Sequence, residues 1–209
     1  MTYGKYIIMS FNAMPKKQLP ITSYNHNNPY RIIYVSIIDQ YKHQCIVVEA
    51  IAGLRKLGLP IVLDLVGPAF PPALKRLNKT LNRFDVDRKW VFYHGAIPFT
   101  ELHKKYSEAN LGLFASSCEN MPNILIEMMA SGLPIVCSNL GPMPEILGPG
   151  GLYFDPESAE SITSAIFQLT ASTQLRKKVC QISYNTAKNY SWRYCSNKTF
   201  AFLELNAKE

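Results

Sequence analysis

Short apolar runs, rich in β-branched residues, alternate along the chain with longer stretches whose apolar positions recur every three or four residues. Such runs are typical of buried β-strands, and the stretches between them have the period of helices with one buried face. Strands are predicted at RIIYVS (31–36), PIVLDLV (60–66), WVFYH (90–94), LGLFA (111–115), PIVCS (134–138) and GLYF (151–154). This alternation predicts an α/β fold with a mainly parallel sheet and helices on both faces.

The predicted helices begin or end at residues that commonly mark helix ends. The first, with its apolar positions from Ile46 to Leu57, stops at Gly58, because glycine is the usual residue after a helix end. Asp155 and Pro156 predict a later helix start, and the C-terminal third is expected to be helical. Three more helices are predicted at 72–84, 100–107 and 123–132. Residues 1–29 are polar, contain proline and show no period, which indicates a leader or an interdomain linker.

Composition limits the class of protein and of ligand. With 209 residues, 47% hydrophobic and 18% charged, the chain is expected to be one soluble, cytoplasmic domain without a membrane span. Five cysteines without a pairing pattern indicate buried thiols, and neither a metal site nor a cofactor is predicted. The net charge of +7 favours anionic ligands or contact with the inner face of a membrane, whereas no nucleic-acid-binding motif is present.

The segment SSCENMPNILIEMMASGLPI places two carboxylates, Glu119 and Glu127, around a predicted helix start at Pro122 and Asn123. Glu119 lies in the loop after a strand, and Glu127 lies inside the helix, up to about 12 Å away. Between them, the free N–H groups of the helix N-terminus favour a phosphate. Two carboxylates that can accept from hydroxyls, with N–H donors for a phosphate between them, suit a nucleotide sugar.

This segment resembles the E-x7-E motif of the family 4 (group 1) glycosyltransferases of GT-B fold. YVSIIDQYKHQ resembles the family's first strand and its lysine-bearing loop, while FYHGAIPFTELHKKYSEANLGLFASS and SGLPIVCSNLGPMPEIL resemble the stretches before and after the motif. With YFDPES and YSW, the likeness covers roughly residues 30–205. It implies the C-terminal, donor-binding half of a two-domain transferase. Residues 30–209 are then a Rossmann-like nucleotide-sugar-binding domain, in which residues 190–209 form a helix that crosses to the other half.

The resemblance also assigns roles to individual residues. It implies that Glu119, the catalytic candidate, contacts the donor sugar, that Glu127 accepts hydrogen bonds from the ribose diol, and that Lys42 neutralises the diphosphate. The remaining substrate-binding candidates are Ser36, Ile97, Asn120, Met121, Pro122 and Asn123. A solvated surface position stays an alternative for Lys42, and a core position is the favoured alternative for Ile97.

The chain departs from the family pattern around the expected phosphate site. Ser36 and Ile37 stand where many members carry glycine and then arginine, so one expected cation is missing. His43 replaces the usual glycine after the lysine. His43 and His94 are expected to be structural, because the sequence assigns neither of them a nucleophile or a carboxylate partner.

Three functional hypotheses follow. The first is the donor domain of a retaining glycosyltransferase that moves a sugar from a nucleotide diphosphate sugar to a glycan or lipid-linked acceptor, as in bacterial-type polysaccharide or lipopolysaccharide synthesis. This hypothesis requires an acceptor-binding domain or subunit. The second is a non-catalytic nucleotide-sugar-binding module, or one subunit of a split transferase. A nucleotide-sugar epimerase is a weaker third.

Overall fold

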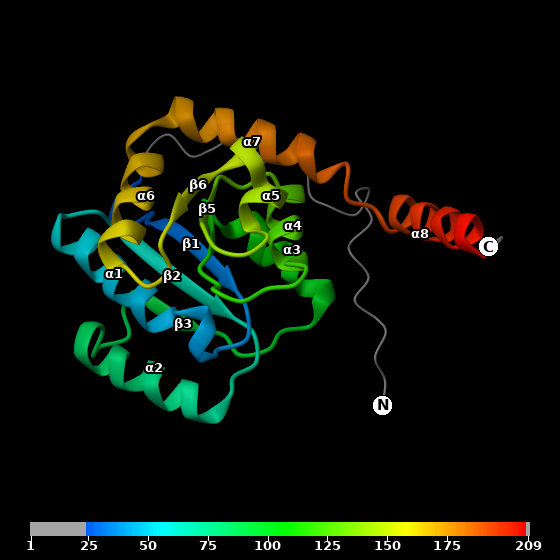
Figure 1. Cartoon of the computed structure of the whole chain (residues 1–209). Coiled ribbons are helices and arrows are strands. Elements are labelled where there is room, and N and C mark those ends of the chain that lie inside the picture. The colour runs from blue at the N-terminus through cyan, green and yellow to red at the C-terminus, as the bar shows by residue number, and fades with distance from the viewer. Residues whose placement is uncertain (1–23, 208–209) are drawn as a thin grey trace.

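A six-stranded parallel sheet forms the centre of the protein, as the sequence predicts (Figure 1). The computed structural model describes residues 24–207, and its strands follow the order β3-β2-β1-β4-β5-β6. The strands are β1 (Tyr30–Val35), β2 (Ile61–Val66), β3 (Val91–Tyr93), β4 (Leu111–Phe114), β5 (Ile135–Ser138) and β6 (Leu152–Phe154). All six predicted strands are therefore confirmed, with ends that differ by at most one residue.

Helices cover both faces of the sheet. They are α1 (Gln44–Lys56), α2 (Pro71–Phe84), α3 (Phe99–Glu108), α4 (Asn123–Ala130), α5 (Met143–Leu147), α6 (Ala159–Ala171), α7 (Thr173–Ala187) and α8 (Trp192–Asn206), with short 3-10 turns η2 (Gln40–Lys42) and η3 (Gly148–Gly150). Figure 1 shows α1, α2 and α6 grouped on one side of the sheet and α3, α4 and α5 on the other. Helix α1 packs against both α2 and α6, and α7 packs against α4.

Two predictions about helix starts and cysteines are wrong in part. Helix α1 does end just before Gly58, whose φ of 87° is left-handed, but α6 begins after Ser158 rather than at Asp155. The Asp155 carboxylate accepts the Glu157 N–H at 2.9 Å, which forms a turn before the helix. Cys137 and Cys180 are buried as expected, whereas the loop residue Cys118 and Cys195 on α8 are exposed. Cys45 is intermediate.

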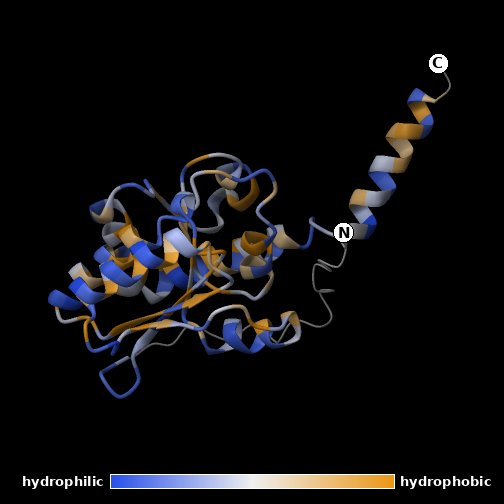
Figure 2. Cartoon of the chain, turned by 90° about the horizontal axis from the view of Figure 1, so that it is seen from below, coloured by the Kyte–Doolittle hydropathy of each residue, from blue (hydrophilic) through white to orange (hydrophobic). Residues whose placement is uncertain are grey.

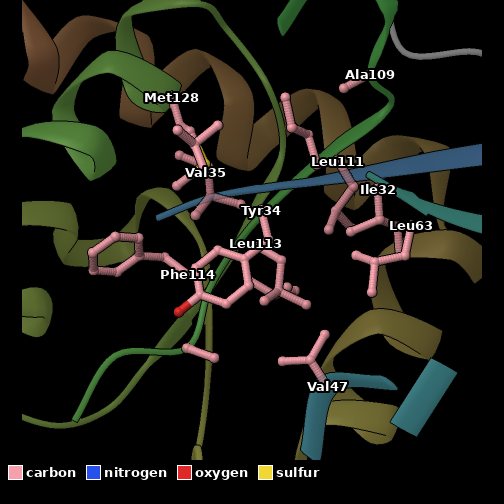
Figure 3. Close-up of a cluster of buried hydrophobic side chains, with 14 of the residues drawn as sticks. Ile32, Tyr34, Val35, Val47, Leu63, Ala109, Leu111, Leu113, Phe114 and Met128 are labelled. Carbon is pink, nitrogen blue, oxygen red and sulfur yellow. The ribbon is translucent and has the colours of Figure 1, made fainter. Parts of the chain in front are cut away.

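The core lies between the central strands and the helices on either side. Figure 3 shows side chains of β1, β2 and β4 meeting Val47 of α1 and Met128 of α4. Helix α4 packs closely on β4, because a Cβ added at Gly112 would lie 2.8 Å from the Met128 sulfur. The helix that carries Glu127 is therefore fixed against the sheet.

The strand order reverses between β1 and β4, and this places a crevice at the carboxyl ends of these two strands. Residues 36–43 connect β1 to α1 on one side of the sheet, and residues 115–122 connect β4 to α4 on the other side (Figure 1). Gly67, after β2, has a φ of 140°, and a Cβ there would collide with the Ser36 carbonyl. Glycine at this position thus allows the loop after β2 to pack against the start of the β1 loop.

The two ends of the described chain differ. Residues 1–23 of the predicted leader or linker lie outside the described residues, but Tyr24 packs on Tyr30 with ring centroids 5.0 Å apart. Helix α8 extends away from the sheet domain (Figures 1 and 2). Its large apolar side chains are 53–73% exposed: Tyr194, Phe200, Phe202, Leu203 and Leu205. Among the described residues, no helix is both long and apolar enough to cross a bilayer.

Candidate functional site

A cavity of about 260 Å³ opens at the crevice between β1 and β4. It brings together most of the predicted site residues: Ser36, Lys42, Glu119, Met121, Pro122, Asn123 and Glu127. Two predicted residues do not line it. Asn120 lies in the adjoining loop, and Ile97 is half-buried against the core, as its alternative interpretation expected.

The two loops that border the cavity are tied to each other and to the sheet. The Ser117 N–H donates to the Tyr41 carbonyl at 2.9 Å, which joins the β4 loop to η2. From below, the buried Tyr34 hydroxyl of β1 donates to the Lys42 carbonyl at 2.8 Å. The turn η2, which contains Lys42, is thus held by a side chain of β1 and by the loop after β4.

Lys42 and Glu119 form an ion pair across the crevice. Their side chains are only 9% and 15% exposed, and the Lys42 Nζ lies 5.4 Å from the centroid of the Phe114 ring. An aromatic face next to an ammonium adds to its stabilisation. Lys42 is therefore an ordered charge inside the site, and its alternative interpretation as a solvated surface residue is wrong.

Glu127 occupies a different environment at the far end of the cavity. It is 5% exposed, and the buried Tyr106 hydroxyl of α3 donates to its Oε2 at 3.3 Å. Burial raises the pKa of Glu127 to about 7, and the Tyr106 hydrogen bond offsets only part of this rise. Among the described residues, no cation pairs with Glu127, so its charge depends on pH near neutrality.

The N-terminus of α4 lies in the chain between the two acids and lines the same cavity. No described side chain caps this end, and no acidic residue lies in its first turn. The unpaired N–H groups and the positive end of the helix dipole attract an anion, by about 0.3–1 kcal/mol for an exposed charge. The arrangement therefore offers donors for phosphate between two carboxylates that can accept from hydroxyls.

The departures from the family pattern have structural explanations. His43 has a φ of 53°, the left-handed region that glycine adopts most easily, which accounts for glycine being usual there. Burial lowers the pKa of the His43 imidazole, so the ring is neutral at pH 7. Ser36 and Ile37, which stand where many family members carry glycine and arginine, are held by Gln44. The Gln44 Nε2 donates to the Ser36 Oγ at 3.0 Å and to the Ile37 carbonyl at 2.8 Å.

Sequence reasoning missed two interactions of the buried carboxyl groups. The buried Asp64 of β2 bonds to the His94 Nε2 at 2.6 Å and accepts from the Arg31 Nη1 at 2.6 Å, so His94 does have a carboxylate partner. Tyr106 was also missed, although its position four residues after Leu102 marks the buried face of α3. Both interactions join elements far apart in sequence, and only the strand register and helix packing reveal them. Within residues 24–207, no three His, Cys, Asp or Glu side chains could hold a metal ion together.

Comparisons with known proteins agree with this geometry. The family model described as "Glycosyl transferases group 1" matches residues 29–172. The O-antigen chain mannosyltransferase B of Escherichia coli is 31% identical over 116 residues, which are 56% of this chain and 30% of that protein. The chain thus spans less than a third of the length of this relative.

Solved structures show the same fold. The C-terminal domain of the group 1 glycosyltransferase LpcC from Francisella tularensis superposes with a TM-score of 0.68 at 24% identity, covering 77% of this chain and 85% of that one. Anabaena HepE, in complex with UDP and glucose, has a TM-score of 0.76 at 19% identity and covers 87% of this chain and 49% of that one. The GT-B fold expectation is confirmed, and the chain belongs to the group 1 glycosyltransferase family.

Proposed function

We propose that the cavity binds a nucleotide diphosphate sugar and that the chain is the donor-binding part of a retaining glycosyltransferase. One observation carries the proposal: Lys42, Glu119, the uncapped start of α4 and Glu127 line one cavity. The acceptor is a glycan or a lipid-linked glycan, as in bacterial-type polysaccharide or lipopolysaccharide synthesis. This choice is supported by the similarity to an O-antigen mannosyltransferase and to a structure that holds UDP and glucose.

The chemistry of the site is charge stabilisation. As the bond from the sugar to the diphosphate breaks, negative charge grows on the departing phosphate oxygens. Lys42 and the N-terminus of α4 stabilise this charge in a site that is already organised before the reaction. Glu119 accepts hydrogen bonds from the sugar hydroxyls and orients the ring, and Glu127 accepts from the ribose diol. The backbone around Asn120 lines the sugar.

A second candidate function is a nucleotide-sugar-binding module without turnover, or one subunit of a split enzyme. The loop at Ser36 and Ile37 favours it, because Gln44 holds that loop where the family often supplies an arginine. The exposed apolar side chains of α8, among them Phe200 and Phe202, suit contact with a second unit that carries the acceptor site. Transfer activity on addition of an acceptor-binding half distinguishes an enzyme part from a binding module.

The binding proposal is tested by thermal unfolding with a panel of uridine, guanosine, adenosine, cytidine and thymidine diphosphate sugars. At 100 times its Kd, a ligand stabilises the folded chain by about 2.7 kcal/mol. For a domain of this size, that is a shift in Tm of about 5–10 °C. We expect such a shift with one or two nucleotides, and a panel without any shift would refute nucleotide-sugar binding.

A further inference from the structure

Helix α2 carries positive charge and no negative charge. Its sequence PPALKRLNKTLNRF contains four bases and no acid, and all four bases are exposed: Lys75, Arg76, Lys79 and Arg83. Lys75, Lys79 and Arg83 follow at intervals of four, so they lie along one side of the helix. Its opposite side buries Ala73, Leu77 and Leu81 against the domain. The cationic side therefore faces solvent along the whole helix, which lies at the outer edge of the domain in Figure 1.

The charge continues onto the end of α1, where the two helices meet. Arg55 and Lys56 of α1 and Arg83 of α2 line one open hollow of about 440 Å³ that contains no acidic residue. A second hollow of about 280 Å³ lies between Lys79 and Arg83, and Glu49 is the one acid among its lining residues. Both hollows are large enough for a phosphate group.

The carboxylates near α2 form no ion pair with these bases among the described residues, although Asp39 and Glu157 line a hollow together with Arg76. The buried Asp85 accepts the N–H groups of the three residues 89–91 at 2.8–3.1 Å, and Asp87 pairs with Lys89 at 2.9 Å. Asp64 is paired with Arg31. Among the described residues, no carboxylate forms an ion pair with the α2 face, a set defined as Lys56, Lys75, Arg76, Lys79 and Arg83.

Exposed apolar side chains lie at the ends of the α2 face. Leu57, directly after Lys56, is 69% exposed, and Val86, three residues after Arg83, is 72% exposed. Phe70, just before α2, is 51% exposed. Bases next to exposed apolar side chains are typical of surfaces that bind the headgroup region of a membrane.

We propose that the α2 face binds the anionic headgroups of a lipid bilayer. The bases attract the negative surface, the hollow at Arg55, Lys56 and Arg83 receives a lipid phosphate, and Leu57 and Val86 enter the headgroup layer. At this hollow a bilayer fits better than a nucleic acid, because the two aromatic rings that line it, Phe84 and Trp90, are covered by guanidinium groups. Arg83 lies 4.8 Å from the Phe84 ring centroid and Arg55 lies 5.5 Å from that of Trp90, so neither ring is open for base stacking.

The proposal does not depend on the sugar site. None of the bases of the α2 face lines the cavity that holds Lys42 and Glu127, so either function can fail without the other. The hollow at Arg55, Lys56 and Arg83 lies at the amino edge of the sheet, because α1 ends just before β2 and α2 ends just before β3, whereas the cavity opens at the carboxyl edge. A membrane bound at this hollow therefore does not cover the cavity.

The test is sedimentation of the full chain with vesicles of phosphatidylglycerol and phosphatidylcholine, compared with phosphatidylcholine alone. We expect binding to the anionic vesicles only, and weaker binding as salt rises. The variant Lys56→Gln/Lys79→Gln/Arg83→Gln should bind on the order of 100-fold more weakly, since each base near an anionic membrane contributes roughly fivefold. A matched control, Lys104→Gln/Lys177→Gln/Lys178→Gln, removes the same charge from exposed positions on α3 and α7 and should lose less than about threefold.

Several results would overturn the proposal. Equal binding to both kinds of vesicle, or equal losses in the two triple variants, would show that the α2 face is not the determinant. Loss of vesicle binding in Phe200→Ser/Phe202→Ser but not in the α2 variant would assign the contact to α8 instead. Tighter binding to a single-stranded RNA than to anionic vesicles would identify a nucleic-acid surface. Equal unfolding midpoints in the parent chain and the two triple variants are expected, because all six substituted side chains are exposed, and they support assigning the lost vesicle binding to the surface charges.

Discussion

The two ends of the segment from Glu119 to Glu127 carry the same type of side chain in opposite environments. At the loop end, Glu119 is paired with Lys42 beside an aromatic ring. At the helix end, Glu127 is buried under Tyr106, no cation within residues 24–207 pairs with it, and burial raises its pKa to about 7. The loop end therefore holds a fixed pair of charges. At the helix end, Glu127 is only partly ionised near neutral pH, and a ligand that donates hydrogen bonds to it favours the ionised form.

This difference indicates how one cavity could distinguish the parts of a nucleotide sugar. A ligand phosphate that approaches Lys42 must compete with Glu119 for it. A ribose diol that donates to Glu127 stabilises the ionised form and thus lowers the pKa of that carboxyl group. The loop end would then contribute to affinity through the charge of Lys42, and the helix end through the ionisation of Glu127. Each contribution can be altered by a separate substitution.

The largest effect is expected from removing the cation at the loop end. Lys42→Met keeps the length of the side chain but leaves Glu119 without its partner. Because a charge-assisted hydrogen bond contributes about 1.5–3 kcal/mol, nucleoside diphosphate affinity should fall by about 10- to 150-fold. Titration calorimetry measures this loss. An unchanged Kd would mean that Lys42 serves only to hold the loop.

Acidic pH should weaken binding through the helix end. With a pKa of about 7, Glu127 is protonated below neutrality, so affinity for a nucleotide sugar should fall by roughly 30-fold between pH 8 and pH 5.5. A nucleotide sugar is the correct ligand because its diphosphate does not titrate in this range. In Glu127→Gln the profile should be flat, and a parallel decline in both proteins would assign the titration to another group.

The same carboxyl group gives the unliganded fold an opposite pH dependence. Its folded pKa of about 7 lies above its ordinary value of 4.5, so the folded state binds the proton more tightly than the unfolded state does. The protonated Glu127 contributes roughly 3 kcal/mol to the free energy of unfolding. This contribution is fully present below pH 4.5 and is lost as pH rises through 7. Urea unfolding at a series of pH values, in the parent chain and in Glu127→Gln, measures this slope.

A smaller effect is expected from Tyr106→Phe, which removes the single hydroxyl that donates to Glu127 among the described residues. Because this hydrogen bond lowers the pKa of Glu127, its loss should move the midpoint of the binding profile above pH 7. A hydrogen bond of about 1 kcal/mol corresponds to about 0.7 pKa unit, so the ionised fraction of Glu127 at pH 7, and with it the affinity, should fall by about threefold. A weaker affinity without a moved midpoint would indicate a packing role for Tyr106.

The smallest effect concerns the backbone of the loop end. His43→Gly removes the strain of a left-handed residue but raises the entropy of the unfolded chain, so stability should change by less than about 1 kcal/mol. His43→Val, with a branched side chain at a φ of 53°, should cost about 1–2 kcal/mol. Equal stabilities of these two variants would mean that the left-handed turn does not constrain the loop next to Lys42.

Much of the fold could be predicted from the sequence, and so could most of the residues that line the candidate cavity. Parallel strands are buried on both faces, so β2 and β5 stand out as continuous apolar runs even with Asp64 inside one of them. The helix start predicted at Pro122 and Asn123 agrees with α4, which begins at Asn123. These are local patterns, and they survive folding because the packing agrees with them.

The environments of the acids could not be predicted, because they arise from contacts between distant segments. Tyr106 reaches Glu127 from another helix, and His94 reaches Asp64 only through the register of β2 with β3. The left-handed turn at His43 was hidden because histidine, unlike glycine, does not signal a positive φ. The α6 start was misplaced because Asp155 and Ser158 are both good capping residues, and only the geometry shows which one is used.

The most direct test of the central claim is calorimetry of Glu119→Gln and Glu127→Gln with the same nucleoside diphosphate and its sugar conjugate. Glu127→Gln should weaken both ligands by about 10- to 150-fold, since the ribose is common to both. Glu119→Gln frees Lys42 and should leave the bare diphosphate at equal or a few-fold tighter affinity, while weakening the sugar conjugate. If both variants bind both ligands like the parent chain, the two acids do not form a nucleotide-sugar site.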